Sequence, residues 1–170
     1  TARDAVGLER YQFEARRFLG ADIDLEVTYR WGWEEVRRTL EEMRNVGRKI
    51  DPTLQMTQVA ALLKTDSRYA AVSREAFLKA MRERQRDALE RLDGEVFDIP
   101  REIRKIDVRF APPGGALGAY YNPPSEDFSR KGTVWYVKLE TPIYPLFDEI
   151  TTGYHEGFPG HHLQCGVQLC

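Results

Sequence analysis

Residues 133–164 read TVWYVKLETPIYPLFDEITTGYHEGFPGHHLQ, and this stretch decides the expected fold. Its first seven residues, 133–139, are rich in β-branched and aromatic side chains and predict a strand. Prolines at 142 and 145 predict a turn, after which apolar residues return to helical spacing from Leu146 to Tyr154. We therefore expect a small β element that leads directly into a helix with a histidine-rich end.

The residues before this stretch predict one more strand and several charged helices. Alternating apolar residues predict a strand at 104–110, and a long loop follows it, with a short strand at 116–121. Apolar residues at steps of three and four predict helices in four segments, namely 4–19, 25–46, 54–63 and 73–92. Asp24 and Ser73 are expected to cap two of these helices, and Gly20 and Gly47 to end two.

This order of elements predicts a mainly α fold with a small β element at about 103–139. We expect a helical scaffold over residues 1–100 and, over 101–170, the β element together with the histidine-rich helix. Residues 111–170 carry only nine of the 52 charged side chains, which sets them apart from the scaffold. The net charge of −2 gives no electrostatic reason to expect a nucleic acid partner. No run of about 18 apolar residues occurs, so we expect no membrane span.

All three histidines of the chain lie within eight residues, in the string YHEGFPGHH. A catalytic zinc uses three protein ligands and keeps one position for water, and a neighbouring carboxylate takes the proton of that water. His155, His161 and His162 are therefore candidate metal ligands, and Glu156 is the candidate general base. In the motif His-Glu-x-x-His the two histidines lie four residues apart on one helix face, whereas here that position is Pro159.

The spacing of these histidines does not suit an unbroken helix. His162 lies near the face of His155 but about 10.5 Å further along, and His161 lies about 120° away from that face. Pro159 disfavours helix at the preceding residue and Gly160 permits unusual dihedral angles, so we expect a break at 157–160. Such a break brings either His161 or His162 next to His155, and we favour His161. The histidine left over would then donate to the site or to substrate.

Five residues ahead of the motif are candidates for substrate binding: Tyr120, Tyr121, Arg130, Trp135 and Tyr136. The two tyrosines of the glycine-rich loop are either donors to a transition state or aromatic side chains that fill the core. Arg130 either holds a substrate carboxylate or is solvated. The strand 133–139, which contains Trp135 and Tyr136, is either an edge strand that pairs with a substrate backbone or an internal strand.

The strings APPGGALGAYYNPP, SRKGTVWYVKL and YHEGFPGHHLQ resemble the bacterial family catalogued as domain of unknown function 885 (DUF885). That resemblance implies a mostly helical, gluzincin-like zinc metallopeptidase architecture, with His155 and His161 or His162 as ligands and Glu156 as general base. It also implies that the protein continues beyond residue 170, that this remainder supplies a glutamate as third ligand, and that the 170 residues are an incomplete and inactive piece.

Together these features predict a zinc-dependent metallohydrolase, namely a peptidase, in which Glu156 helps a water attack an amide carbonyl. The expected partners are a peptide or amide substrate and the remainder of the protein's own chain. The alternative is a relative that binds metal without catalysis or without hydrolysis. An iron site is such a case, because iron also binds two histidines and one carboxylate.

Overall fold

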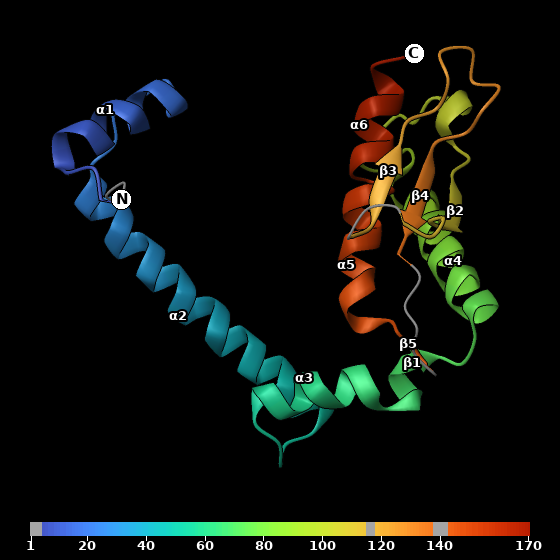
Figure 1. Cartoon of the computed structure of the whole chain (residues 1–170), viewed down its shortest axis with the longest axis horizontal. Coiled ribbons are helices and arrows are strands. Elements are labelled where there is room, and N and C mark those ends of the chain that lie inside the picture. Colours follow the sequence, from blue (N-terminus) through green and yellow to red (C-terminus); the bar gives the residue numbers. More distant parts are fainter. Residues whose placement is uncertain (1–4, 115–117, 138–142) are drawn as a thin grey trace. The chain divides into compact units, whose positions relative to one another are not determined.

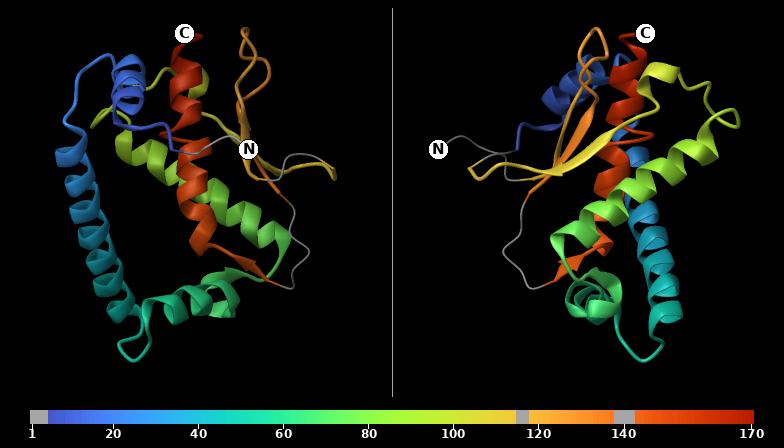
Figure 2. Two further views of the ribbon diagram at one scale, coloured as in Figure 1. Left: turned by 60° about the vertical axis from the view of Figure 1, so that its left-hand side comes forward. Right: turned by 90° about the vertical axis from the view of Figure 1, so that its right-hand side faces the viewer.

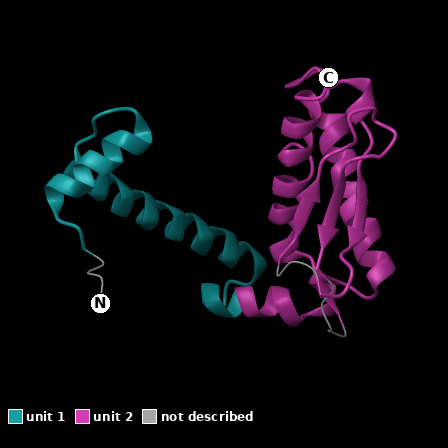
Figure 3. Cartoon of the chain, turned by 45° about the horizontal axis from the view of Figure 1, so that its top comes forward, with its two compact units in different colours: residues 1–59 teal, residues 60–170 magenta. Residues whose placement is uncertain are grey.

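The computed structural model describes residues 5–114, 118–137 and 143–170 (Figure 1). The chain is mainly helical with a few short strands, as predicted. It divides into two compact units, Thr1–Val59 and Ala60–Cys170 (Figure 3). The expected scaffold over 1–100 and site region over 101–170 stay a prediction. Within the second unit, the helix of residues 74–92 packs against the strands and helices that follow it.

The first unit contains helix α1 (Leu8–Leu19) and helix α2 (Leu25–Ile50). Asp24 caps α2 as expected, since its side chain accepts a hydrogen bond from the backbone amide of Val27. The stop expected at Gly47 is wrong, because α2 runs on to Ile50. Asp51 precedes a proline, a position that disfavours helix, and it ends α2 instead.

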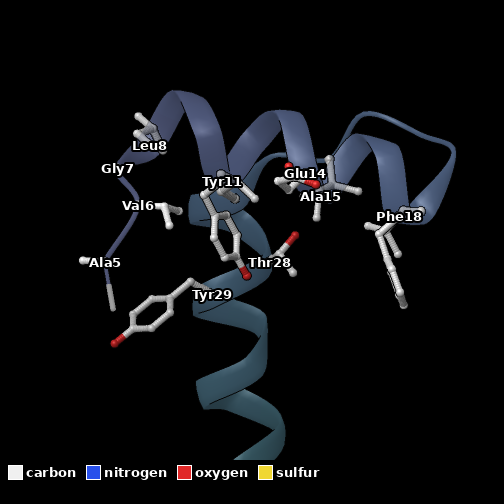
Figure 4. A pocket seen from close by; sticks show the side chains of 13 residues that line it. Ala5, Val6, Gly7, Leu8, Tyr11, Glu14, Ala15, Phe18, Thr28 and Tyr29 are labelled. Atoms are coloured by element: carbon white, nitrogen blue, oxygen red, sulfur yellow. The ribbon is translucent and has the colours of Figure 1, made fainter. Parts of the chain in front are cut away.

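Large apolar side chains of the first unit remain on its surface. Among the described residues of α1 none is buried, and in α2 only Gly47 is. A groove of about 980 Å³ runs between the two helices. Figure 4 shows Tyr11 of α1 pointing toward Thr28 and Tyr29 of α2, whereas Phe18 points away from them. The helical periodicity of this unit therefore correctly predicts helices, but not burial.

The second unit holds most of the remaining helices and every strand found among the described residues. Helix α3 (Met56–Thr65) spans the boundary between the units, and α4 (Arg74–Leu92) follows it, capped by Ser73. Helices α5 (Phe147–Glu156) and α6 (His161–Val167) follow one another in nearly the same direction (Figures 1 and 2). Two short 3₁₀ turns, η1 and η2, cover Ser67–Tyr69 and Arg101–Ile103.

The strands form one pair and one three-stranded sheet. Strand β1 (Ala70–Ala71) pairs with β5 (Tyr144–Pro145). In the sheet, β2 (Asp107–Phe110), β4 (Thr133–Tyr136) and β3 (Tyr120–Asn122) lie in this order. Strand β4 is parallel to β2 and antiparallel to β3.

This sheet corrects the edge-strand interpretation of residues 133–139. Both sides of β4 are already paired, so no substrate backbone has a free edge to join there. The observed strand ends at Tyr136, and residues 138–139 of the expected strand lie outside the described residues. For the expected strand 116–121, residues 116–117 are likewise outside, and β3 begins at Tyr120.

Two clusters of buried side chains hold the second unit together. In the first, Phe77 and Met81 of α4 pack with Val108, Val134 and Tyr136 of the sheet. In the second, Ile99 and Ile103 pack around Phe158, which is fully buried. The second cluster lies under the turn between α5 and α6, so it connects the core directly to the histidine-rich segment. Among the described helices, none is long and apolar enough to span a membrane.

Candidate metal centre

The break between α5 and α6 lies where the sequence predicts it. His155 and Glu156 are the last residues of α5, and His161 is the first residue of α6. Between them, Gly157 ends the first helix and the Phe158–Pro159 peptide bond is cis. The turn is closed by the amide of Gly160, which donates to the carbonyl of Tyr154 at 3.0 Å.

This turn brings three of the four predicted residues together. Potential ligand atoms of His155, Glu156 and His161 all lie within 4.8 Å of one another. The two imidazole rings meet edge to face, with centroids 4.8 Å apart, and a carboxylate oxygen of Glu156 lies 3.9 Å from Nε2 of His155. The side chain of His155 is 67% exposed and that of Glu156 only 16%, so the cluster opens to solvent on the side of His155.

The chemistry of these donors fits a divalent transition metal. Two imidazoles and one carboxylate are a ligand set of both catalytic zinc and non-haem iron sites. The three residues lie on either side of one short turn, so the separation of their side chains depends on the shape of that turn. What fixes the turn therefore decides whether the cluster can bind a metal.

A buried glutamine of α4 links α5 to the turn that follows it. The side-chain amide of Gln85 donates to the carbonyl of Gly153 at 2.7 Å, and its oxygen accepts from the amide of Phe158 at 2.6 Å. Gln85 is almost completely buried. Buried polar groups stabilise a structure only when they are paired, and here both ends of the amide are paired. Gln85 thus joins α5, which carries His155 and Glu156, to the turn that leads to His161.

The remaining histidine, His162, points away from the cluster. Its side chain is 1% exposed, and Nε2 lies 2.7 Å from the carbonyl oxygen of Ile103. Its other ring nitrogen, Nδ1, lies 2.8 Å from the hydroxyl of Tyr121. Burial lowers the pKa of His162, against the opposing effect of the Ile103 carbonyl. With both nitrogens engaged by protein groups, His162 offers no free ligand atom in this conformation.

Of the five residues predicted to bind substrate, only Tyr121 lies beside the cluster. Its ring stacks on His161 with centroids 6.5 Å apart, and burial raises the pKa of its hydroxyl. Tyr121 comes from the outer strand β3 and lies among the partly buried residues of the first core cluster.

The other four candidates lie elsewhere. Tyr120 points to the opposite side of its strand and stacks on Trp135 of β4 at 6.1 Å. The side chain of Tyr136 is 2% exposed and belongs to the core, so it does not face the cluster or solvent in this conformation. The guanidinium of Arg130 donates to the carbonyl of Pro123 at 2.7 Å and so stabilises its own loop.

Sequence reasoning missed three residues that support the site. Gln85 carried a usable signal, since it falls at the same helical spacing as Phe77 and Met81 and is uncharged within a charged segment. Ile103 supplies a backbone carbonyl, and no side-chain pattern reveals that. Gly132 lies so close to Tyr121 and His162 that a Cβ there would be 2.6 Å from Nδ1 of His162.

The family comparison agrees with the motif. A sequence model of the family described as "Bacterial protein of unknown function (DUF885)" matches residues 1–169. The chain belongs to this family. The DUF885 description assigns no function, so it adds none to the geometry of the site. Among curated proteins, none matches the chain.

A solved structure resembles this DUF885 chain. It is described as "The crystal structure of the putative lipoprotein from Colwellia psychrerythraea", and it superposes with a TM-score of 0.73 at 23% sequence identity. The match covers 92% of the DUF885 chain described here and 28% of the other chain. At this identity the likeness concerns the fold alone. The DUF885 chain thus spans little more than a quarter of the length of that relative.

Proposed function

We propose that this chain carries part of the active site of a zinc-dependent hydrolase of amide bonds, with peptides as the substrate class. The observation that carries the proposal is the cluster of His155, Glu156 and His161. Two imidazole ligands with a carboxylate beside them as general base are the combination that metallopeptidases of the gluzincin kind use, and we propose that architecture for the whole protein. The proposal assigns His155 and His161 as ligands and leaves one further ligand to a part of the protein outside these 170 residues.

Each residue of the cluster has a separate task in this proposal. A bound zinc ion supplies Lewis acidity, which makes a water a strong nucleophile near neutral pH. Glu156 takes the proton of the attacking water and passes it to the leaving amine. The exposed side of the cluster, at His155, is where substrate enters. Gln85 ties α5 to the start of the turn that leads to His161.

The test is the substitution Glu156→Gln in the full-length protein. We expect metal content to stay near that of the wild type while peptide cleavage falls by about 10²-fold or more, the scale of losing a general base. Glu149→Gln is the matched control, because Glu149 is a half-buried carboxylate of the same helix outside the cluster. Metal content is measured by elemental analysis and cleavage by mass spectrometry of a peptide mixture. His155→Ala should remove both metal and activity.

A second candidate function follows from the position of the Glu156 carboxylate within the ligand set. If Glu156 is itself a ligand, the cluster is a site of two histidines and one carboxylate, which suits non-haem iron and a chemistry other than hydrolysis. In that case Glu156→Gln lowers metal content along with activity, and elemental analysis of the wild type finds iron. Metal retained by the glutamine variant, without activity, favours the zinc hydrolase.

A further inference from the structure

The hydrogen bonds of His162 define which of its ring nitrogens carries the proton. A backbone carbonyl can only accept, so Nε2 of His162 must donate to Ile103 at 2.7 Å. In the neutral ring the other nitrogen, Nδ1, is then an acceptor. The hydroxyl of Tyr121, 2.8 Å away, is therefore the donor to His162. The three groups form a chain with one direction, from the Tyr121 hydroxyl through His162 to Ile103.

This chain begins at a ring, that of Tyr121, which contacts the metal cluster. The ring of Tyr121 stacks on His161 at an interplanar angle of 20° and meets His162 edge to face at 5.7 Å. Space for this arrangement exists because residue 132 has no side chain, as a Cβ there would collide with both the hydroxyl and the imidazole. Ile103 in turn packs on the backbone of α6, where a Cβ at Gly166 would lie 3.1 Å from its own Cβ.

We propose that Tyr121 and His162 form a positioning pair that fixes the imidazole of His161 in the orientation it has beside His155 and Glu156. His162 is thus a positioning residue and not a ligand, although it is the direct neighbour of one. The proposal rests on the proposed metal site. It adds that the affinity of that site depends on a hydroxyl that touches neither the metal nor Glu156.

Two substitutions of His162 separate its two hydrogen bonds. Asparagine places its amide oxygen near the position of Nδ1, so His162→Asn keeps an acceptor for Tyr121. Glutamine places its amide nitrogen near the position of Nε2, so His162→Gln keeps a donor for Ile103 and loses the acceptor. Tyr121→Phe removes the hydroxyl and leaves the ring. Tyr120→Phe is the matched control, since Tyr120 stacks on Trp135 on the opposite side of the strand.

The first measurement is zinc affinity of the full-length protein by competition with a chelating dye. We expect Tyr121→Phe and His162→Gln each to weaken zinc binding by about 10-fold, as loss of a group that orients a ligand does. His162→Asn should stay within about 3-fold of the wild type, and Tyr120→Phe should have no effect. The double variant Tyr121→Phe/His162→Gln should bind no more weakly than either single variant, because both break one pair.

The second measurement needs no metal. Nuclear magnetic resonance of ring-labelled histidines in the metal-free protein should show His162 protonated at Nε2, and Tyr121→Phe should shift the ring resonances of His161. A wild type that binds zinc, together with a Tyr121→Phe variant that changes neither zinc affinity nor the His161 resonances, overturns the positioning pair and leaves the metal site intact. If both His162 variants lose zinc as completely as His155→Ala does, His162 is a ligand. That result also overturns the positioning pair.

A wild type that binds no metal, but in which Tyr121→Phe still shifts His161, refutes the proposed function and supports the pair. The two proposals therefore fail on different results.

Discussion

The two compact units use helices in opposite ways. In the first, α2 extends over 26 residues with only Gly47 buried, and aromatic side chains such as Trp33 stay exposed. In the second, α5 and α6 are shorter, yet glycines at Gly153 and Gly166 let core side chains approach their backbones. Length and amphipathic spacing thus make a helix, while close packing and paired polar groups fix where its side chains point. The candidate metal centre lies in the second unit, where close packing and paired polar groups fix the side chains.

The largest expected difference between the units concerns buried and exposed phenylalanines. Phe158 is fully buried under the α5–α6 turn, so Phe158→Ala should lower the free energy of unfolding by about 3–5 kcal/mol. Phe18 is 90% exposed, and Phe18→Ala should change it by no more than about 0.5 kcal/mol. Urea unfolding of the full-length protein measures both. A large loss at Phe18 would show that another part of the protein covers α1.

The next effect concerns a buried amide. Gln85→Met keeps the shape of the side chain but leaves the buried amide of Phe158 without a partner, at a cost of about 1–3 kcal/mol. We also expect weaker metal binding, because the turn that leads from α5 to His161 loses its link to α4. Gln12→Met on the exposed surface of α1 is the control and should be nearly neutral in both measurements. Equal effects at the two positions would remove the assigned role of Gln85.

Two glycine-to-alanine substitutions, one in each unit, should change stability in opposite directions. Both Gly32 and Gly153 lie inside helices, where alanine is intrinsically more favourable by about 0.5–1 kcal/mol. At Gly32 a Cβ meets nothing within 4 Å, so Gly32→Ala should be stabilising. At Gly153 a Cβ would lie 2.6 Å from the hydroxyl of Tyr136, so Gly153→Ala should destabilise by about 1–3 kcal/mol. Calorimetric melting temperatures that move in the same direction would contradict this.

The smallest effect is electrostatic. Hydrogen bonds from arginine side chains, Arg48 first, lower the pKa of Glu41 in α2, whereas hydrogen bonds from Ser125 and Ser129 hold that of Asp127 at about 2. Raising the salt concentration should return the pKa of Glu41 toward its usual value and leave Asp127 nearly unchanged, because screening weakens charge pairs. Titration by nuclear magnetic resonance measures both.

The lowered pKa of Asp127 also sets the pH range in which its ionised carboxylate stabilises the folded loop. An aspartate in the unfolded chain has a pKa of about 3.9, so the folded loop gains stability from the ionised form above that pH. This contribution is lost as pH falls through about 2, where Asp127 becomes protonated in the folded state. A loop that opens already between pH 6 and 5 would show that another group controls it.

Much of the fold was predictable because it depends on local signals. The caps at Asp24 and Ser73, the stop at Gly20 and the break around Pro159 each follow from neighbouring residues, and the structure has them all. Periodicity also correctly predicted that the apolar residues of α2 share one side of the helix. It could not show that the face stays exposed, since burial depends on a partner that the pattern does not contain.

The candidate site was predictable only in part. The residue types at 155, 156 and 161 suggested a metal site, and their spacing required a break. The choice between His161 and His162 depends on the turn at 157–160, where helical angles no longer apply. The supports of the site come from residues distant in sequence, namely Gln85, Ile103 and Gly132, and none carries a motif. The sequence left undecided whether β4 is an edge strand or an internal strand, because a strand's own residues do not encode its pairing partners.

The two neighbouring histidines also differ in when they reach their final surroundings during folding. His161 meets His155 across six residues, so this contact closes a short loop and can form early. His162 bonds to Ile103 across 59 residues and to Tyr121 across 41, so its contacts wait until distant parts of the chain have met. In refolding experiments, signals from adjacent rings should therefore report different stages, with His162 marking the later one.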